Sequence, residues 1–454
     1  MTARPWILLP IETKAREFHA KVLQAAVAAE GAFDVVLGEQ NALVRQLPWL
    51  PRGIYVDKSI GRTKTQPFRR LASLGYRIAA WCEEGLVYRD RDTYLHERVA
   101  TDSLALADRF FAWGDVQAAD IGYLQPSVGG KIRVSGNPRF DVLRPELRGM
   151  FGPEADGIRQ RHGAFILVVT NFGRYNHFMG RGFPLEVQRR RGAIRSESDA
   201  AAFQDWHEYQ GVLFRSFSAM VSRLCKGFPR HTVVVRPHPS ENHDAWRSEI
   251  AGLNNAVVAF DGSSIPWITA AGAVVHNSCT TGVESFMLGQ TAITYRPVRN
   301  DKHDAFLPNA LSREADDHDS LVALVRDGLA GTLAGVIDAA RVADRYVASQ
   351  SGPLAAERVV AELATLEVRP TLYRPTVTDR LSLSADAALE RLLPLLRSVR
   401  VGRRADAYAR QKFPGIAVAE VQDVLRRIQA VTGRFAGVTA CALPAHGCFH
   451  VGMR

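Results

Sequence analysis

Short apolar runs alternate with helical segments along the first third of this 454-residue chain. The runs predict strands at Trp6 to Leu9, Asp34 to Gly38, Gly53 to Val56, Arg77 to Trp81, Arg109 to Gly114 and Lys131 to Gly136. Between the first two, an Ala-rich segment from Glu17 to Ala29, closed by Gly31, predicts a helix. Strands at this spacing favour βαβ units and a parallel sheet.

The same alternation restarts after Pro145. Further strands are predicted at Phe165 to Val169, Thr232 to Val235, Ala256 to Phe260, Ala273 to Val275 and Thr291 to Tyr295. Because one hydrophobic core rarely exceeds about 250–300 residues, the chain is expected to form more than one domain. The predicted fold class is α/β, with two doubly wound, Rossmann-like domains facing each other across a cleft. Their predicted bounds are 1–155 and 156–350, and residues 351–454 are predicted to be a helical crossover and C-terminal extension.

Polar residues follow two strands of the second domain. The run from Ala273 to Val275 leads into His276 and a stretch rich in hydroxyl groups that predicts the start of a helix. Such a helix start presents unpaired N–H groups and a positive dipole end, which suit a phosphate. The residues expected there are Asn277, Ser278, Thr280, Thr281 and Glu284, the last of which could reach a ribose. Ordinary helix capping is the alternative role for the Ser and Thr residues.

The strand at Thr232 to Val235 ends in Arg236, Pro237, His238 and Pro239. The two prolines restrict the backbone around His238, so its imidazole is expected to point in a fixed direction, towards a phosphate oxygen. Arg236 would add positive charge. The alternative is a rigid turn that contains an incidental histidine.

In the first domain, Glu83 and Glu84 come directly after a buried strand, and Gly85 permits a sharp turn. A carboxylate half-buried beside Trp81 would have a raised pKa, which suits a general base. A helix cap or an ion pair is the alternative for either residue. Other polar residues are predicted to line the cleft for an acceptor or a sugar: Glu12, Lys14, Arg16, Asn137, Arg139 and Asn171. No metal ligand set and no cofactor are expected.

The chain carries a net charge of +10, but its basic residues are dispersed and no nucleic-acid-binding motif is present, so nucleic acid is not expected as a partner. The five cysteines match neither a disulfide framework nor a zinc pattern, and no apolar run is long enough to span a membrane. These features predict a cytoplasmic protein. An apolar stripe near the C-terminus precedes several arginines and fits either a packed cap or peripheral contact with the inner membrane. The stripe contains Leu389, Leu392, Leu393, Leu396 and Val399.

Several motifs resemble the bacterial surface carbohydrate biosynthesis protein family between about residues 6 and 300. They are Pro10 to Glu17, Pro51 to Tyr55, Glu83 to Tyr88, Gly136 to Asp141, Thr170 to Phe172, Arg236 to Pro239 and Ser278 to Glu284. The motifs are also similar to those of GT-B glycosyltransferases that use CMP-activated acidic sugars, such as bacterial sialyltransferases and Kdo transferases. The chain departs from them at Cys82, where Asp is usual, and this weakens any mechanism that needs a third carboxylate.

This resemblance implies a metal-independent GT-B glycosyltransferase that moves a Kdo- or nonulosonic-type sugar from a CMP donor to a glycan or lipid-linked glycan of the bacterial surface, such as lipopolysaccharide or capsule. Glu83 or Glu84 would be the base, His238 would contact the CMP phosphate, and Ser278, Thr280 and Thr281 would cradle it. Two alternatives stay open: a nucleotide-sugar epimerase of the same fold, and a non-catalytic polysaccharide-assembly protein.

Overall fold

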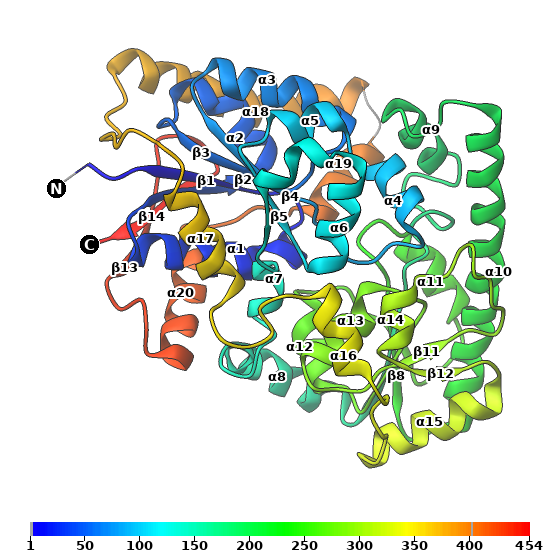
Figure 1. The fold of residues 1–454 in the computed structure, drawn as a ribbon. Helices are drawn as coiled ribbons and strands as arrows, with labels where there is room; N and C mark the ends of the chain where they lie inside the picture. Colours follow the sequence, from blue (N-terminus) through cyan, green and yellow to red (C-terminus); the bar gives the residue numbers. More distant parts are fainter. Residues whose placement is uncertain (1–2, 401–402) are drawn as a thin grey trace. The chain divides into compact units, whose positions relative to one another are not determined.

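The computed structural model describes residues 3–400 and 403–454, and the chain divides into two compact units (Figure 1). The first unit contains Met1–Gly85, Arg98–Met150 and Val347–Arg454, and the second contains Leu86–Glu97 and Phe151–Tyr346. The C-terminal segment therefore belongs to the same unit as the N-terminus. The domain bounds expected from the sequence stay predictions.

The first unit is built on one eight-stranded sheet in the order β13-β14-β2-β1-β3-β4-β5-β6. Its strands are β1 (Trp6–Ile11), β2 (Asp34–Glu39), β3 (Gly53–Asp57), β4 (Arg77–Trp81), β5 (Arg109–Ala112), β6 (Ile132–Val134), β13 (Val438–Ala442) and β14 (Cys448–Met453). Strands β1 to β6 pair in parallel, as predicted, whereas β14 pairs antiparallel with β2 and with β13. Figure 1 shows the two red C-terminal strands beside the blue N-terminal ones.

Strand β1 lies at a topological switch point. The chain runs from β1 to its neighbour β2 on one side, and then returns to β3 on the other side of β1. In a doubly wound sheet, the connections that leave the two neighbouring strands at a switch point, here β1 and β3, run to opposite sides of the sheet. A crevice therefore forms outside the carboxyl ends of these strands. The segments at this place are Glu12 to Lys14 after β1 and Lys58 to Ser59 after β3.

Helix α1 (Lys14–Glu30) begins three residues earlier than its apolar pattern predicts. The N–H groups of Arg16 and Glu17 both donate to the Thr13 carbonyl, which closes the first turn. The small alanines allow close packing, and α1 lies against α17, α20 and β14. The other helices of this unit are α2 (Gln40–Gln46), α3 (Thr65–Ser73), α5 (Thr101–Leu106), α6 (Asp115–Leu124), α7 (Pro138–Asp141), α17 (Ala355–Ala364), α18 (Val377–Arg400), α19 (Arg403–Lys412) and α20 (Val418–Thr432).

The C-terminal segment is helical, as predicted, but ends in the β13–β14 hairpin that extends the first sheet. Of the predicted apolar stripe, Leu389 and Leu392 are exposed, and the side chains of Leu393, Leu396 and Val399 lie outside the described residues. Within residues 3–400 and 403–454, no helix combines the length and the apolar character needed to cross a membrane.

The second unit is built on a six-stranded parallel sheet in the order β12-β11-β10-β7-β8-β9. Its strands are β7 (Phe165–Val169), β8 (Thr232–Arg236), β9 (Ala256–Val258), β10 (Ala273–His276), β11 (Ile293–Tyr295) and β12 (Arg313–Ala315). The chain adds β8 and β9 on one side of β7 and then crosses to β10 on the other side. The switch point of this sheet therefore lies between β7 and β10.

The longest helix of the second unit, α10 (Glu197–Gly227), starts at a capping box formed by Ser196 and Asp199. Its Phe214 and Phe217 pack with Phe172 and Trp246 in an aromatic core. The other helices are α4 (Arg91–Arg98), which spans the boundary between the units, α8 (Gly152–His162), α9 (Phe183–Arg190), α11 (His243–Glu249), α12 (Ser264–Ala270), α13 (Thr280–Met287), α14 (Phe306–Ala310), α15 (His318–Ala330) and α16 (Ala339–Tyr346).

Candidate functional site

The two predicted carboxylates after β4 lie in different environments. Glu83 is 5% exposed, and its Oε1 accepts a hydrogen bond of 2.6 Å from Nε1 of Trp81. Its Oε2 lies 3.4 Å from Nη1 of Arg139, which is also buried. The Glu84 side chain is 45% exposed and lies 2.5 Å from Arg98. Glu83 is therefore part of a buried ion pair, and Glu84 belongs to the surface.

A second buried carboxylate, Glu17, belongs to the same group of charges. Its oxygens accept the backbone N–H groups of Glu12 at 3.0 Å and Thr13 at 3.2 Å. One helical turn further along α1, Lys21 is 2% exposed and its Nζ lies 4.0 Å from the centroid of the Trp81 ring. Within the part of the chain that the structure describes, this Nζ has no hydrogen-bond partner.

These buried groups shift one another's pKa values. Burial, together with the negative charge of Glu83, raises the pKa of Glu17 to about 7. Burial also acts on Glu83, but Arg139 and Lys21 outweigh it and lower the pKa of that carboxyl group. Burial lowers the pKa of Lys21. Of the two buried carboxylates, Glu17 is therefore the one that binds a proton more readily.

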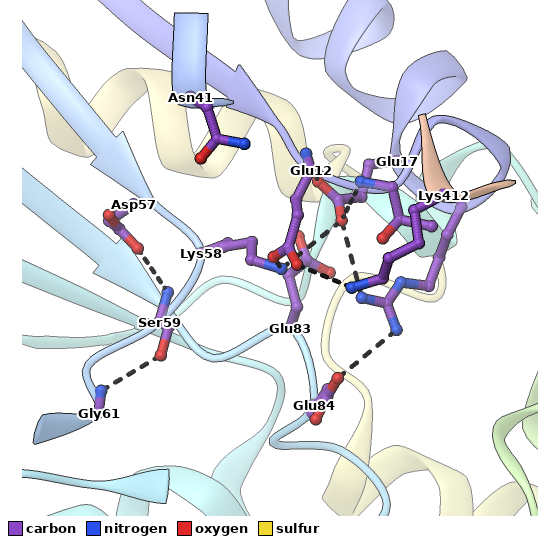
Figure 2. A network of polar contacts seen from close by, with 12 residues as sticks. Glu12, Glu17, Asn41, Asp57, Lys58, Ser59, Gly61, Glu83, Glu84 and Lys412 are labelled. Carbon is purple, nitrogen blue, oxygen red and sulfur yellow. Dashed lines mark hydrogen bonds and ion pairs between the residues drawn. The ribbon is translucent and has the colours of Figure 1, made fainter. Parts of the chain in front are cut away.

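Lys58 links this group to the switch point (Figure 2). Its ammonium group pairs with Glu12, which also accepts a hydrogen bond of 3.0 Å from Lys412, and it lies 4.0 Å from Oε1 of Glu17. The backbone carbonyl of Lys58 accepts the N–H of Glu83 at 3.0 Å, which joins the ends of β3 and β4. Burial lowers the pKa of Lys58 to about 8. We call Glu12, Glu17, Lys21, Lys58, Glu83 and Arg139 the acid–base cluster.

The remaining predicted residues of the first unit lie at the border of this cluster. Lys14 pairs with Glu420 of α20 at 2.5 Å. Arg16 lies 3.7 Å from Glu17 and 3.9 Å from Glu84. Asn137 caps α7, because its Oδ1 accepts the N–H of Arg139 at 3.0 Å.

Glu17, Lys21 and Lys58 were not among the residues predicted from the sequence. The first two are spaced i, i+4 on a helix, a pattern typical of a solvated ion pair. Lys58 carried a usable signal, because it follows a predicted strand directly, as Glu83 does.

In the second unit, His238 is held by the loop that follows β8. Its Nδ1 accepts the backbone N–H of Ser240 at 3.2 Å and lies 2.7 Å from the Ser240 hydroxyl. A backbone N–H can only donate, so Nδ1 carries no proton and Nε2 carries it. Nε2–H is the kind of donor that a phosphate oxygen accepts. Gly173 makes room for this loop, because a Cβ there would lie 2.0 Å from Oγ of Ser240.

Glu241, which sequence analysis did not select, ties this loop to the end of β7. It is fully buried and accepts hydrogen bonds from Thr170 Oγ1 at 2.7 Å and from Trp246 Nε1 at 2.8 Å. It also accepts the backbone N–H groups of Phe172 and His238, both at 3.0 Å. Burial raises the pKa of Glu241. Glu241 therefore fixes the position of His238 relative to β7.

Arg236 serves a structural purpose in this structure. It is 5% exposed, and its guanidinium donates to the carbonyls of Asp261 at 2.9 Å and Gly262 at 2.6 Å. Burial lowers its pKa to about 10. It thus holds the loop between β9 and α12, and the positive charge that was predicted beside His238 is directed to those carbonyls.

The turn between β10 and α13 has an unusual backbone. Ser278 adopts a φ of +48°, in the left-handed region that residues other than glycine enter rarely. Its hydroxyl donates to Oδ1 of Asn309 at 3.0 Å, and Thr294 Oγ1 donates to the same oxygen at 2.8 Å. Strained residues of this kind cluster at functional sites and need support from their surroundings.

His276 supplies part of that support. It is fully buried, its Nε2 lies 2.8 Å from the Ser312 hydroxyl, and its Nδ1 accepts the N–H of Cys279 at 3.4 Å. Burial lowers its pKa to about 3, so the imidazole is neutral. Gly282 is required beside it, because a Cβ at that position would lie 2.6 Å from Nε2.

The other predicted residues of this unit surround the same turn. Asn277 is buried, and its Oδ1 has no hydrogen-bond partner among the described residues. Thr280 and Thr281 open α13, the first half-buried and the second buried. Glu284 accepts a hydrogen bond of 3.3 Å from Ser264. Asn171, after β7, is exposed.

No known protein-family model matches the chain. No curated protein matches its sequence. Solved structures do match its fold. The UDP-GlcNAc 2-epimerase of Methanocaldococcus jannaschii matches with 11% identity over 79% of this chain and 99% of its own, at a TM-score of 0.46. The UDP-GlcNAc 2-epimerase of Neisseria meningitidis matches with 11% identity over 79% of this chain and 98% of its own, at a TM-score of 0.46. The wall teichoic acid polymerase TagF matches with 8% identity over 79% of this chain and 87% of its own, at a TM-score of 0.46.

At this level of identity, the similarity concerns the fold alone. The two sheets of the structure, one wholly parallel and one parallel from β1 to β6, confirm the predicted α/β fold class with two Rossmann-like units.

One prediction is corrected. Several of the similar structures are UDP-GlcNAc 2-epimerases, named for a UDP sugar. The sequence-based prediction of a transferase for CMP-activated Kdo or nonulosonic acid is therefore wrong, and the alternative of a nucleotide-sugar epimerase fits these findings better. The sequence motifs indicate polar strand ends that are suited to an anion, and many nucleotide sugars carry one. The motifs do not identify the nucleotide's base or the sugar.

Proposed function

We propose that this protein is an enzyme that epimerises the sugar of a UDP-sugar. The observation that carries the proposal is the acid–base cluster, in which the pKa values of Glu17 and Lys58, about 7 and about 8, both lie close to neutral. Inversion of a carbon that bears hydrogen requires removal of a proton and its return to the other face. Groups whose pKa lies near the working pH perform both steps most efficiently.

Of the two groups in the cluster whose pKa lies near neutral, Lys58 is the better placed for contact with a substrate. Its side chain is 13% exposed, whereas Glu17 is fully buried. Lys58 Nζ lies 4.0 Å from the carboxyl group of Glu17. When the neutral amine of Lys58 takes up a proton, an ionised Glu17 can therefore balance the new positive charge. Glu83 and Arg139 stay charged and fix the local field. We assign Lys58 as the proton-transfer residue and Glu17 and Glu83 as positioning residues.

The second unit would hold the nucleotide. Its strand ends at β7, β8 and β10 offer neutral donors: the Nε2–H of His238 and the N–H groups at the start of α13. Phosphate oxygens accept such donors, and a sheet's switch point is the usual place for a nucleotide in doubly wound folds. Glu284, beside Ser264, is suited to accept a ribose hydroxyl.

The test is to incubate the full-length protein with a UDP-N-acetylhexosamine in D2O and to follow the sugar by proton NMR. We expect a second epimer to accumulate and deuterium to replace hydrogen at the inverted carbon. Lys58→Met should reduce that rate at least about 100-fold, in the range found for general acid–base groups. The control is Lys64→Met, which changes a lysine of the same connection that pairs with Asp57 at 2.8 Å.

Absence of both epimer and deuterium with every UDP-sugar tested would refute the epimerase. Release of UDP when a glycan acceptor is added would point to glycosyl transfer. Absence of any thermal shift with UDP or UDP-sugars would favour the non-catalytic assembly protein.

A further inference from the structure

A separate group of reactive side chains lies in the antiparallel part of the first sheet. Cys441 of β13 pairs directly with His450 of β14, so both side chains stand on one face of the sheet. The Cys441 Sγ lies 3.9 Å from Nδ1 of His450. On the other side of the ring, Nε2 of His450 lies 2.9 Å from Oδ1 of Asp34 in β2. The thiol, the imidazole and the carboxylate therefore form a chain of hydrogen-bonded groups.

The contacts of His450 indicate which atoms donate a hydrogen and which accept one. An ionised Asp34 can only accept, so the proton of the neutral imidazole resides on Nε2 and points to the carboxylate. Nδ1 then presents its lone pair to the thiol. This is the order of groups in which an imidazole, oriented by an acid, removes a proton from a nucleophile.

The backbone leaves space for this arrangement. Gly452 lies two residues after His450 on the same strand and face, and a Cβ there would lie 2.7 Å from both Oδ1 of Asp34 and Nε2 of His450. Cys441 is also accessible, since it is exposed while Cys82, Cys225, Cys279 and Cys448 are buried.

We propose that Cys441 is a reactive thiol, activated by His450 and oriented through Asp34, that undergoes exchange with small-molecule disulfides. The Cys441 thiol gives its proton to Nδ1 of His450, and the thiolate attacks one sulfur of the disulfide. A new S–S bond to Cys441 forms while the original S–S bond breaks. The departing thiolate takes the proton from the imidazolium and leaves as a thiol. Cys441 is thereby oxidised and the outgoing sulfur reduced, with no other reactant.

This modification site is independent of the proposed epimerase, because it uses none of the residues of the acid–base cluster. The test is to mix the native, full-length protein at neutral pH with dithiodipyridine, whose released thiol absorbs light. We expect one fast-reacting thiol per chain that is lost in Cys441→Ser. His450→Gln should slow the fast phase about tenfold or more, because the thiolate, not the thiol, attacks. Asp34→Asn should slow it by a smaller factor.

The matched control is His446→Gln, which changes the exposed histidine in the turn between the same two strands. It should leave the rate unchanged. Because His450→Gln could act by disturbing the sheet, the rate is also measured for His450→Ala with added imidazole, which should restore it in a concentration-dependent way. Equal rates for the native protein and His450→Gln, or a fast phase that survives in Cys441→Ser, would overturn the proposal.

Discussion

The two sheets place opposite chemistry at equivalent positions. Beyond the carboxyl ends of β1, β3 and β4 lie three acidic and three basic side chains that are buried or half-buried: Glu12, Glu17, Glu83, Lys21, Lys58 and Arg139. Beyond β7, β8 and β10 lie mostly hydroxyl, amide and neutral imidazole groups. There, the buried carboxylate Glu241 contacts neutral donors, where Glu83 in the first sheet faces Arg139.

In the proposed function, this difference lets one topology serve two tasks. A parallel sheet with a switch point brings the ends of distant segments together whatever their sequence. The residues that follow the strands then decide whether such a place is suited to proton transfer or to an anion. Mutations should therefore have different consequences in the two units, and four experiments test this, beginning with the largest expected effect.

Glu83→Ala should destabilise the first unit by about 3–5 kcal/mol, because removal of one member of a buried ion pair leaves Arg139 and Lys21 uncompensated. Urea unfolding measures this change. Glu84→Ala is the matched control, and as an exposed ion-pair partner it should cost no more than about 1 kcal/mol. Equal costs for the two variants would show that Glu83 is not held as a buried charge.

Glu17→Gln should remove a pH-dependent part of the stability. In the folded protein the pKa of Glu17 is raised from 4.5 to about 7. A group whose pKa is raised on folding stabilises the fold below the pKa of the unfolded chain and loses this contribution as the pH passes the folded value. The native protein should thus lose about 2–3 kcal/mol between about pH 4.5 and 7 relative to the variant. If the free energy of unfolding, measured with urea, changed with pH in the same way for the native protein and for Glu17→Gln, this prediction would be contradicted.

Gly282→Ala should destabilise the second unit by about 1–3 kcal/mol, since the new methyl group overlaps the His276 ring. Gly157→Ala in α8 is the control, because a Cβ there meets nothing within 4 Å. That variant should gain about 0.5–1 kcal/mol from helix propensity. The comparison is made by measuring the melting temperature of each variant. If both melting temperatures shifted in the same direction, His276 would not be tightly packed.

His238→Ala should weaken binding of UDP about tenfold, the value of one hydrogen bond to a charged group. Isothermal titration calorimetry measures the affinity. His231→Ala is the control, because His231 precedes β8 and His238 follows it, so the two lie at opposite ends of one strand. Equal losses of affinity would remove His238 from the nucleotide site.

The sequence predicted the strands well because buried parallel strands are short, apolar and bounded by turns. It also predicted that Glu83, His238 and Ser278 follow such strands, since residue order alone places them there. The role of Arg236 could not be predicted in the same way. Its guanidinium turns to the carbonyls of Asp261 and Gly262, which are 25 and 26 residues away in the chain.

Helix α1 shows the limit most clearly. Glu17 and Lys21 have the spacing of a solvent-exposed ion pair, but both are buried, on a helix that contacts α7, α17, α20 and β14. Three of these elements, α17, α20 and β14, come from the last 100 residues of the chain, so no residue near Glu17 in the sequence indicates its burial. The same holds for Asp34, which meets His450 only because β14 pairs with β2.

The sequence by itself therefore determined the α/β class, the places of β1 to β11 along the chain and the residue types that follow them, because these depend on local patterns of polarity. The tertiary structure decided which charges are buried, which strands border a switch point and which distant residues meet. Those properties depend on the exclusion of water by segments that are far apart in the chain. Desolvation, and not residue type, moves the pKa values of Glu17 and Lys58 towards neutral.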